Sequence, residues 1–134
     1  MRKILRAALA ASCLAVLVIG AQPAFANDDD VIVEGDCSGA SDFKLKLSPE
    51  HGRIEVEFEV DQNIVGDNWR VVLRQDGERF FRGVRMTQAP SGSFEVRQVV
   101  DNNQGDDLVQ TKARNLSTDE LCRGKAVATF GTSR

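Results

Sequence analysis

Few side chains in this chain could carry out a reaction. Tyrosine is absent, the one histidine is His51, and the three cysteines are Cys13, Cys37 and Cys122. A Ser–His–Asp site needs a buried and oriented histidine, whereas His51 stands in a predicted turn at 49–52. Zinc is bound by several histidine and cysteine ligands together, and too few are present. The sequence therefore predicts a protein that is not an enzyme, with no catalytic residue, no metal ligand and no cofactor.

The N-terminal residues 1–26 have the three parts of a secretion signal. Basic residues open the segment, an apolar run follows at 7–21, and an Ala-x-Ala ending provides the small residues that signal peptidase reads. A membrane anchor is the alternative, but the run is shorter than the roughly 20 residues that a span needs, and Pro23 closes it. We expect cleavage after Ala26, loss of Cys13 with the signal, and a secreted, extracellular product without a membrane span.

Export would place Cys37 and Cys122 in an oxidising environment, where pairing into a disulfide is the default. Such a bond would stabilise the fold by about 4–5 kcal/mol in the chain-entropy model. We expect residues 27–36 to be an acidic flexible tail that contains at most a short edge strand at 31–33, and 37–134 to be a single domain. Loss of the signal would change the formal net charge from −3 to −6.

From residue 41 onward, apolar and polar residues alternate with the period of half-buried strands. No window of useful length has helical periodicity, and turn signals such as Asp76-Gly77 separate the alternating segments. We expect strands at 41–48, 53–60, 69–75, 79–87, 93–101, 108–115 and 120–130. Seven strands with short turns between them predict an all-β protein, an antiparallel β-sandwich.

Trp69 opens the third expected strand, a tight hairpin follows it, and the sixth strand precedes a final hairpin. This order resembles immunoglobulin-like and fibronectin type III domains. The stretch from Cys37 to Phe130, with its PSGSFEV segment and ATF ending, is similar to small secreted actinobacterial proteins of unassigned function. The resemblance implies a seven-stranded immunoglobulin-like sandwich and export, and it implies no chemistry. The cysteines depart from the antibody pattern, because they stand at the first and last strands.

Alternating strand directions place the starts of the first and last strands at the same end of the expected sandwich. A bond between Cys37 and Cys122 is therefore geometrically natural there. The loops 61–68, 88–92 and 116–119 are expected at this end as well. The disulfide would then brace these loops, and a secreted proteinase inhibitor acting through them is one alternative function.

The outward-facing charges differ between the two expected sheets. The sheet of the first, second and fifth strands has a mixed set: Lys44, Lys46, Glu55, Glu57, Glu59, Glu95 and Arg97. The other sheet has only basic residues, which we call the basic face: Arg70, Arg74, Arg82, Lys112, Arg114, Arg123 and Lys125. The position of Arg82 depends on Phe80-Phe81, because both rings can point inward only with a bulge, and Arg82 could otherwise exchange faces with Arg85.

Such a face could attract an anionic partner, for example a cell-envelope polymer or an acidic protein. Arginine suits this role because its planar fork binds phosphate or carboxylate through two hydrogen bonds. Nucleic acid is disfavoured, because interleaved aromatic residues for base stacking are missing. The alternative is that the basic residues only keep the sheet soluble. We therefore expect a secreted, non-enzymatic binding or structural module whose partner the sequence does not identify.

Two loops are rich in Asp, Asn and Gly, the residue types found in calcium loops. In the loop 61–68, Val65 stands at the third ligand position and Val72 at the twelfth, where a glutamate is needed. The loop 102–107 is the second candidate. The same residues are ordinary in turns. A calcium-stabilised extracellular module is therefore a further alternative.

Overall fold

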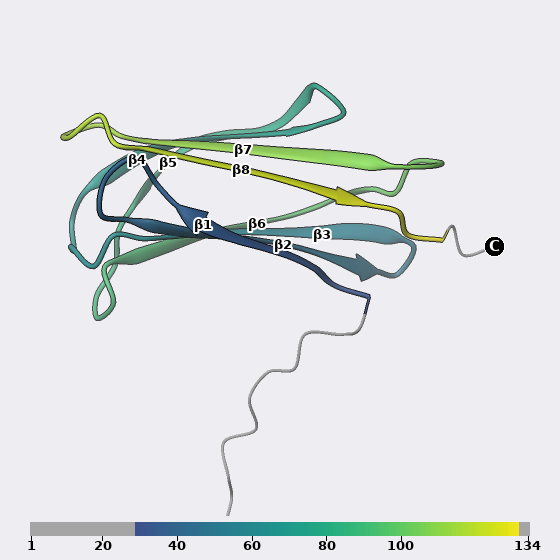
Figure 1. Ribbon diagram of the computed structural model, residues 1–134, viewed down its shortest axis with the longest axis horizontal. Coiled ribbons are helices and arrows are strands. Elements are labelled where there is room, and N and C mark those ends of the chain that lie inside the picture. Colours follow the sequence, from purple (N-terminus) through teal and green to yellow (C-terminus); the bar gives the residue numbers. More distant parts are fainter. Residues whose placement is uncertain (1–28, 132–134) are drawn as a thin grey trace, which may run out of the picture.

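The computed structural model describes residues 29–131, which form eight strands and, within that range, no helix. The strands are β1 (Val31–Asp36), β2 (Asp42–Glu50), β3 (Arg53–Asp61), β4 (Asn68–Gln75), β5 (Glu78–Met86), β6 (Ser93–Asp101), β7 (Asp107–Asn115) and β8 (Leu121–Ala128). They make two antiparallel sheets of order β1-β2-β3-β6 and β5-β4-β7-β8 (Figure 1). The expected signal at 1–26, with Cys13, lies outside the described residues.

The predicted count of seven strands is wrong, because β1 adds an eighth. The segment expected as a flexible tail pairs with β2 from Val31 opposite Leu47 to Asp36 opposite Asp42. Val31 and Val33 are half-buried and pack against the core. The short apolar alternation therefore outweighs the acidic composition of this segment. The other seven strands lie within two residues of their predicted bounds.

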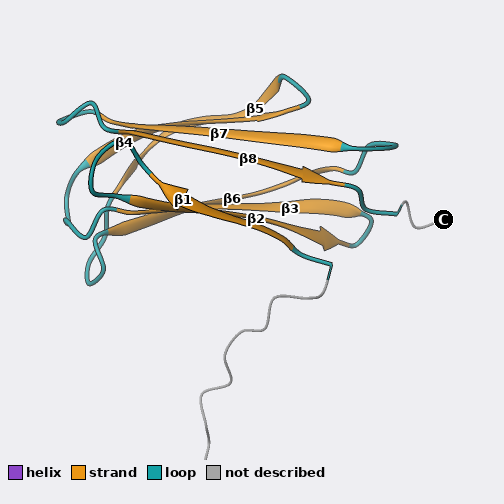
Figure 2. Ribbon diagram, in the orientation of Figure 1, coloured by secondary structure: helices purple, strands orange, loops and turns teal. Residues whose placement is uncertain are grey.

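The core lies between the two sheets, which face each other in Figure 2. Alternate residues of each strand point inward, and the largest fully buried side chains are Trp69 and Phe58, one from each sheet. Trp69 also contacts Phe94 of β6, with ring centroids 6.1 Å apart. Because both sheets bury one face against the other, the chain has a β-sandwich-like all-β fold whose outer faces are exposed to solvent.

A bulge in β5, where it pairs with β4, determines how Phe80 and Phe81 are oriented. Leu73 lies opposite Phe81, but Arg74 lies opposite Arg79, so that Phe80 is the extra residue. Beyond the bulge, Arg82 pairs with Val72 on the outer face, as predicted. Arg85 lies on the inner side opposite Trp69, where its guanidinium covers the Phe81 ring 5.0 Å from the centroid. Such a contact is typically worth about 0.5–1 kcal/mol at an exposed site.

The predicted disulfide joins Cys37, which follows β1, to Cys122 in β8. Next to it, the Ser38 amide donates to the Leu121 carbonyl at 2.7 Å, and the Leu121 amide donates to Ser38 Oγ at 2.9 Å. These contacts attach the segment between β1 and β2, in the first sheet, to β8, the last strand of the second sheet. The bond therefore lies where the sequence places it, between the first and last parts of the fold.

Candidate functional site

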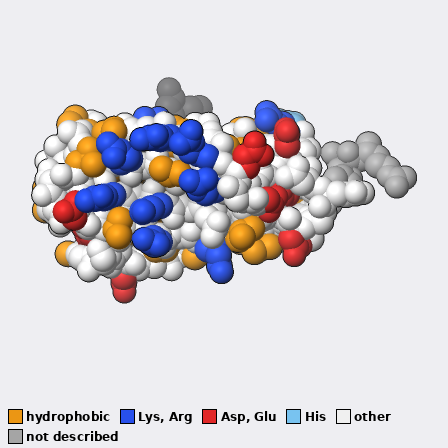
Figure 3. Space-filling view, turned by 90° about the horizontal axis from the view of Figure 1, so that it is seen from above, with side chains coloured by type: hydrophobic (Ala, Val, Ile, Leu, Met, Phe, Trp, Pro, Cys, Tyr) orange, Lys and Arg blue, Asp and Glu red, His pale blue; other side chains and the backbone are white. Residues whose placement is uncertain are grey.

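All seven residues of the basic face are exposed and lie on the outer surface of the sheet β5-β4-β7-β8. Figure 3 shows their Lys and Arg side chains gathered on this face. The bulge adds one cation that the sequence pattern misses, because Arg79 lies opposite Arg74 and so shares its face. The sequence contains one indication of this bulge, the Phe80-Phe81 pair, because two adjacent rings cannot both point inward in a regular strand.

The register of the strands aligns these residues in rows across the sheet. Val72, Lys112 and Arg123 form one row, and the next row holds Arg74, Gln110 and Lys125. Neighbouring residues in a row are about 5 Å apart, and adjacent outward rows are separated by about 7 Å along each strand. The cations of three strands therefore stand close enough to act on a single bound molecule.

Within residues 29–131, the basic face has one ion pair, between Arg114 and Asp119 at 2.6 Å. The guanidinium of Arg74 donates to the Gly77 carbonyl at 3.4 Å. No other residue of this face has a carboxylate within ion-pair distance in the described part of the chain. Most of the positive charge on this face is thus available to an external anion.

The opposite sheet pairs its cations with acids. Lys46 lies 3.3 Å from Glu57, Glu57 also pairs with Arg97, and Lys44 stands directly between Glu34 and Glu59 in the register. Opposite charges on adjacent strands attract each other, whereas like charges repel. The two outer faces of this protein therefore differ in electrostatics, as predicted, and only one carries a net excess of unpaired cations.

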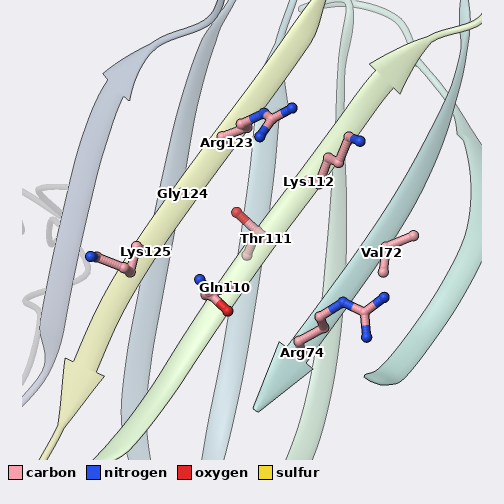
Figure 4. Close-up of a pocket in the computed structure, with 8 residues that line it drawn as sticks. All are labelled: Val72, Arg74, Gln110, Thr111, Lys112, Arg123, Gly124 and Lys125. Atoms are coloured by element: carbon pink, nitrogen blue, oxygen red, sulfur yellow. The ribbon is translucent and has the colours of Figure 1, made fainter. Parts of the chain in front are cut away.

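A groove of about 520 Å³ lies on the basic face. Its lining residues are Val72, Arg74, Gln110, Thr111, Lys112, Arg123, Gly124 and Lys125. In Figure 4, Lys112 and Arg123 lie on one side of Thr111, and Arg74, Gln110 and Lys125 lie on the other. The structure thus brings four residues of the basic face around one hollow, which periodicity alone does not reveal.

The loops proposed to bind a protease do share one end of the molecule. The Gln62 amide donates to the Gly92 carbonyl at 3.1 Å, and the Leu116 amide donates to the Asn68 carbonyl at 2.8 Å. Ile64 and Val65 are the most exposed large apolar residues of the described chain, at 56% and 53%. They form an apolar tip among the loops at this end (Figure 1).

The loop 61–68 uses its carboxylate inside the protein. Asp67 Oδ2 accepts hydrogen bonds from Gln62 Nε2 at 2.6 Å and from Asn115 Nδ2 at 3.0 Å, and these bonds, with the one from Asn115 foremost, lower the pKa of Asp67. Gln62 Oε1 in turn accepts from the buried Trp69 indole at 3.0 Å. This network joins the loop to β4 and to the end of β7.

The loop 102–107 lies at the opposite end of the molecule (Figure 1) and has a similar arrangement. The buried Asp107 carboxylate accepts from Gln75 Nε2 at 2.7 Å and from Asn103 Nδ2 at 2.9 Å. Among residues 29–131, no group of three or more His, Cys, Asp and Glu side chains is placed to hold a metal ion. Asp67 and Asp107 are thus occupied by amide donors. The Asp106 carboxylate accepts from the Thr129 hydroxyl at 2.6 Å.

Three carboxylates face one another across the first sheet, where β2 pairs Asp42 with Asp36 on one side and with Asp61 on the other. A hydrogen bond with Asp36, followed by desolvation and the charges of Asp36 and Asp61, raises the pKa of Asp42. Because the folded pKa lies above the unfolded one, ionised Asp42 destabilises the fold, and acidification relieves this effect. This row does not follow from the sequence pattern, because the segment that contains Asp36 is expected to be a tail.

We therefore expect Asp42→Asn to raise the Tm at neutral pH, because it removes the charge repelled by Asp36 and Asp61 and its amide supplies a hydrogen-bond donor. The gain should disappear as the pH falls through the pKa of Asp42, where the wild-type carboxyl is also neutral. Thermal unfolding followed by circular dichroism between neutral and acidic pH measures both effects. Glu78→Gln makes the same change in net charge at an exposed position, so an equal gain from this control would contradict the local explanation.

The remaining candidate for catalysis, His51, has a side chain that is 94% exposed and lies 3.1 Å from the Glu50 carboxylate. The described part of the chain also contains no helix long and apolar enough to cross a membrane. The groove on the basic face is therefore the feature with the clearest chemical character. A comparison with models of known protein families finds none that matches this chain. No curated protein matches its sequence either.

Proposed function

We propose that this protein is a secreted, non-enzymatic binding module that holds an anionic polymer on its basic face. The observation that carries the proposal is the set of exposed and mostly unpaired cations on one face of a protein with net negative charge. Lysine and arginine on a shared surface attract anions from solution and hold phosphate or carboxylate groups. A cell-envelope polymer is the favoured partner, and an acidic protein is the alternative.

The arrangement of charges favours binding over a purely solubilising role. Arg70 lies directly opposite Arg114, and Lys112 lies directly opposite Arg123. Like charges directly opposite each other destabilise a sheet, whereas a soluble face can be built from alternating signs, as on the other sheet. A bound polyanion would relieve this repulsion. The repulsion that destabilises the free sheet would therefore favour the complex.

The fold and the disulfide support the extracellular part of the proposal. We infer an immunoglobulin-like, fibronectin type III-like architecture, in which β2, β3 and β6 face β5, β4, β7 and β8, with β1 as an added edge strand. This strand order supports the resemblance seen in the sequence. The Cys37–Cys122 bond is typical of proteins that work in an oxidising compartment.

Charge reversal on the basic face should abolish binding. We expect the wild-type protein to be retained on immobilised inorganic polyphosphate at low salt and to be released by added salt, because exposed charges are screened. The triple variant Arg70→Glu, Arg74→Glu and Lys112→Glu should pass through the column unretained, because it places acids in the centre of the face.

The matched control is Lys44→Glu, Arg53→Glu and Arg85→Glu, which makes the same change in net charge away from the basic face. It should still be retained, and circular dichroism should show cooperative unfolding of both triple variants. Failure of the wild type to bind at low salt would contradict the proposed function. Equal loss of retention in both triple variants would show that retention depends on net charge alone and would contradict a specific role for the basic face.

A further inference from the structure

The groove on the basic face has a direction. One wall is the row Val72, Lys112 and Arg123, and the other is the row Arg74, Gln110 and Lys125, each drawn from β4, β7 and β8 in turn. Since each row runs from strand to strand, the space between the rows crosses the strands instead of following them. Both walls carry two cations each, so the groove is positively charged along both sides.

The floor of the groove is made of backbone. Between the two rows lies the pair Thr111 and Gly124, and both residues direct their substituents toward the core. Thr111 is 4% exposed, and a Cβ atom on Gly124 would lie 2.6 Å from Thr111 Oγ1 and 2.9 Å from the Phe43 ring. No side chain therefore rises between the walls on β7 and β8, and a chain-like ligand can lie flat there.

Few groups of the protein itself compete with a ligand for the four cations of the groove. Within the described residues, Arg74, Lys112, Arg123 and Lys125 form no ion pair with a carboxylate. By contrast, Arg114 outside the groove is paired with Asp119. The charges that line the hollow are thus available to a ligand, as are those of Arg70 and Arg82 outside it.

We propose, on the basis of the function proposed above, that this groove binds a linear polymer whose phosphates are part of its chain and that the polymer crosses β4, β7 and β8. A phosphate within the chain lies between both walls when the chain lies on the floor, so that its free oxygens can accept from either side. The carboxylates of an acidic protein hang from the chain, and a chain lying in the groove would direct each of them toward one wall only. Arginine in both walls adds forked donors suited to phosphate.

The proposal is tested by binding titrations of the folded protein with three probes. These are short inorganic polyphosphate, polyglutamate of the same charge, and phosphatidylglycerol vesicles, all at one low salt concentration. We expect polyphosphate to bind at least about tenfold more tightly than polyglutamate, a difference of about 1.4 kcal/mol. Vesicles should bind more weakly than polyphosphate, because a bilayer surface cannot enter a groove between rows of side chains.

Two double variants locate the site. Lys112→Gln with Arg123→Gln removes one charged wall of the groove, and Arg70→Gln with Arg82→Gln removes the same charge from the same face outside the groove. We expect the first pair to weaken polyphosphate binding about 30-fold, as the loss of two charge-assisted contacts implies. The second pair should weaken it only about threefold, because these charges act at a distance.

The outcomes separate this proposal from the proposed function. Equal loss in the two double variants would contradict the groove while leaving the basic face as the binding surface. Equal affinity for polyglutamate would contradict the preference for in-chain phosphate, and preference for vesicles would assign the face to a lipid surface instead. Absence of any binding by the wild type would contradict both the groove and the proposed function.

Discussion

Replacing Cys37 and Cys122 together by alanine is expected to lower the free energy of unfolding by about 4 kcal/mol. The bond spans a sequence separation of 85 residues, and a long closed loop restricts the unfolded chain strongly, by about 4–5 kcal/mol in the chain-entropy model. Cys122 is also fully buried, so its sulfur packs in the core. A domain of this size has a total stability of about 5–15 kcal/mol, which makes the disulfide a large contribution. Urea denaturation of both proteins measures the difference.

Reduction supplies the control for this prediction. A reductant should destabilise the wild type to nearly the level of the double alanine variant and leave the variant itself unchanged. Cys122 points into the core, whereas its neighbour Arg123 and Lys125 point outward from β8. The folded fraction of the variant should therefore bind polyphosphate as the wild type does. A loss of stability below about 1 kcal/mol would contradict the role assigned to the disulfide.

Asn115→Ala is expected to cost about 3 kcal/mol, the second large effect. Asn115 is fully buried and donates to the Asp67 carboxylate at 3.0 Å, while its Oδ1 accepts from the amides of Ser117 at 2.8 Å and Thr118 at 3.2 Å. Each such bond contributes about 1 kcal/mol, more when one partner is charged, and buried groups left without partners add to the cost. Chemical denaturation of the variant checks the magnitude.

The nearly isosteric variant Asn115→Asp separates charge from shape. It keeps the acceptor for Ser117 and Thr118 but places a second carboxylate against Asp67, so we expect it to be destabilised at neutral pH and to recover as the pH falls. The wild type should behave in the opposite way. The pKa of Asp67 is lowered in the fold, so its contribution is complete above the unfolded value and is lost as the pH falls through the folded value. Parallel pH profiles of Tm would contradict this account.

The strands of this fold could be predicted from the sequence because, in a half-buried strand, every second residue faces the core and is apolar. Trp69, Val71 and Leu73 all lie in the core, and the basic residues of the same sheet lie outside, as alternation requires. Only a short edge strand at 31–33 could be anticipated within β1, because acidic residues precede it and its apolar pattern is short. The strand is formed by backbone pairing with β2 along its whole length, and so short an apolar pattern does not reveal this pairing.

The groove and the polar networks could not be predicted, because they depend on contacts between distant segments. Which cation faces which across β4, β7 and β8 is set by register, and the outward position of Arg79 is set by a bulge. The bond from Trp69 to Gln62 likewise requires the loop to fold back over the end of the sheet. Sequence patterns identify the residues of the basic face, and only the assembled sheet shows which four surround a hollow.

The central claim is that a defined set of cations on the basic face binds a polyanion. The most direct measurement is the affinity of the wild type and of the Lys112→Gln, Arg123→Gln variant for inorganic polyphosphate as a function of salt. If four cations contact the polymer, the logarithm of the binding constant should fall with the logarithm of salt concentration with a slope of about −3, by analogy with single-stranded nucleic acids. The variant should show a slope smaller in magnitude by about 1.4. Binding that is independent of salt, or a slope unchanged in the variant, would contradict the claim.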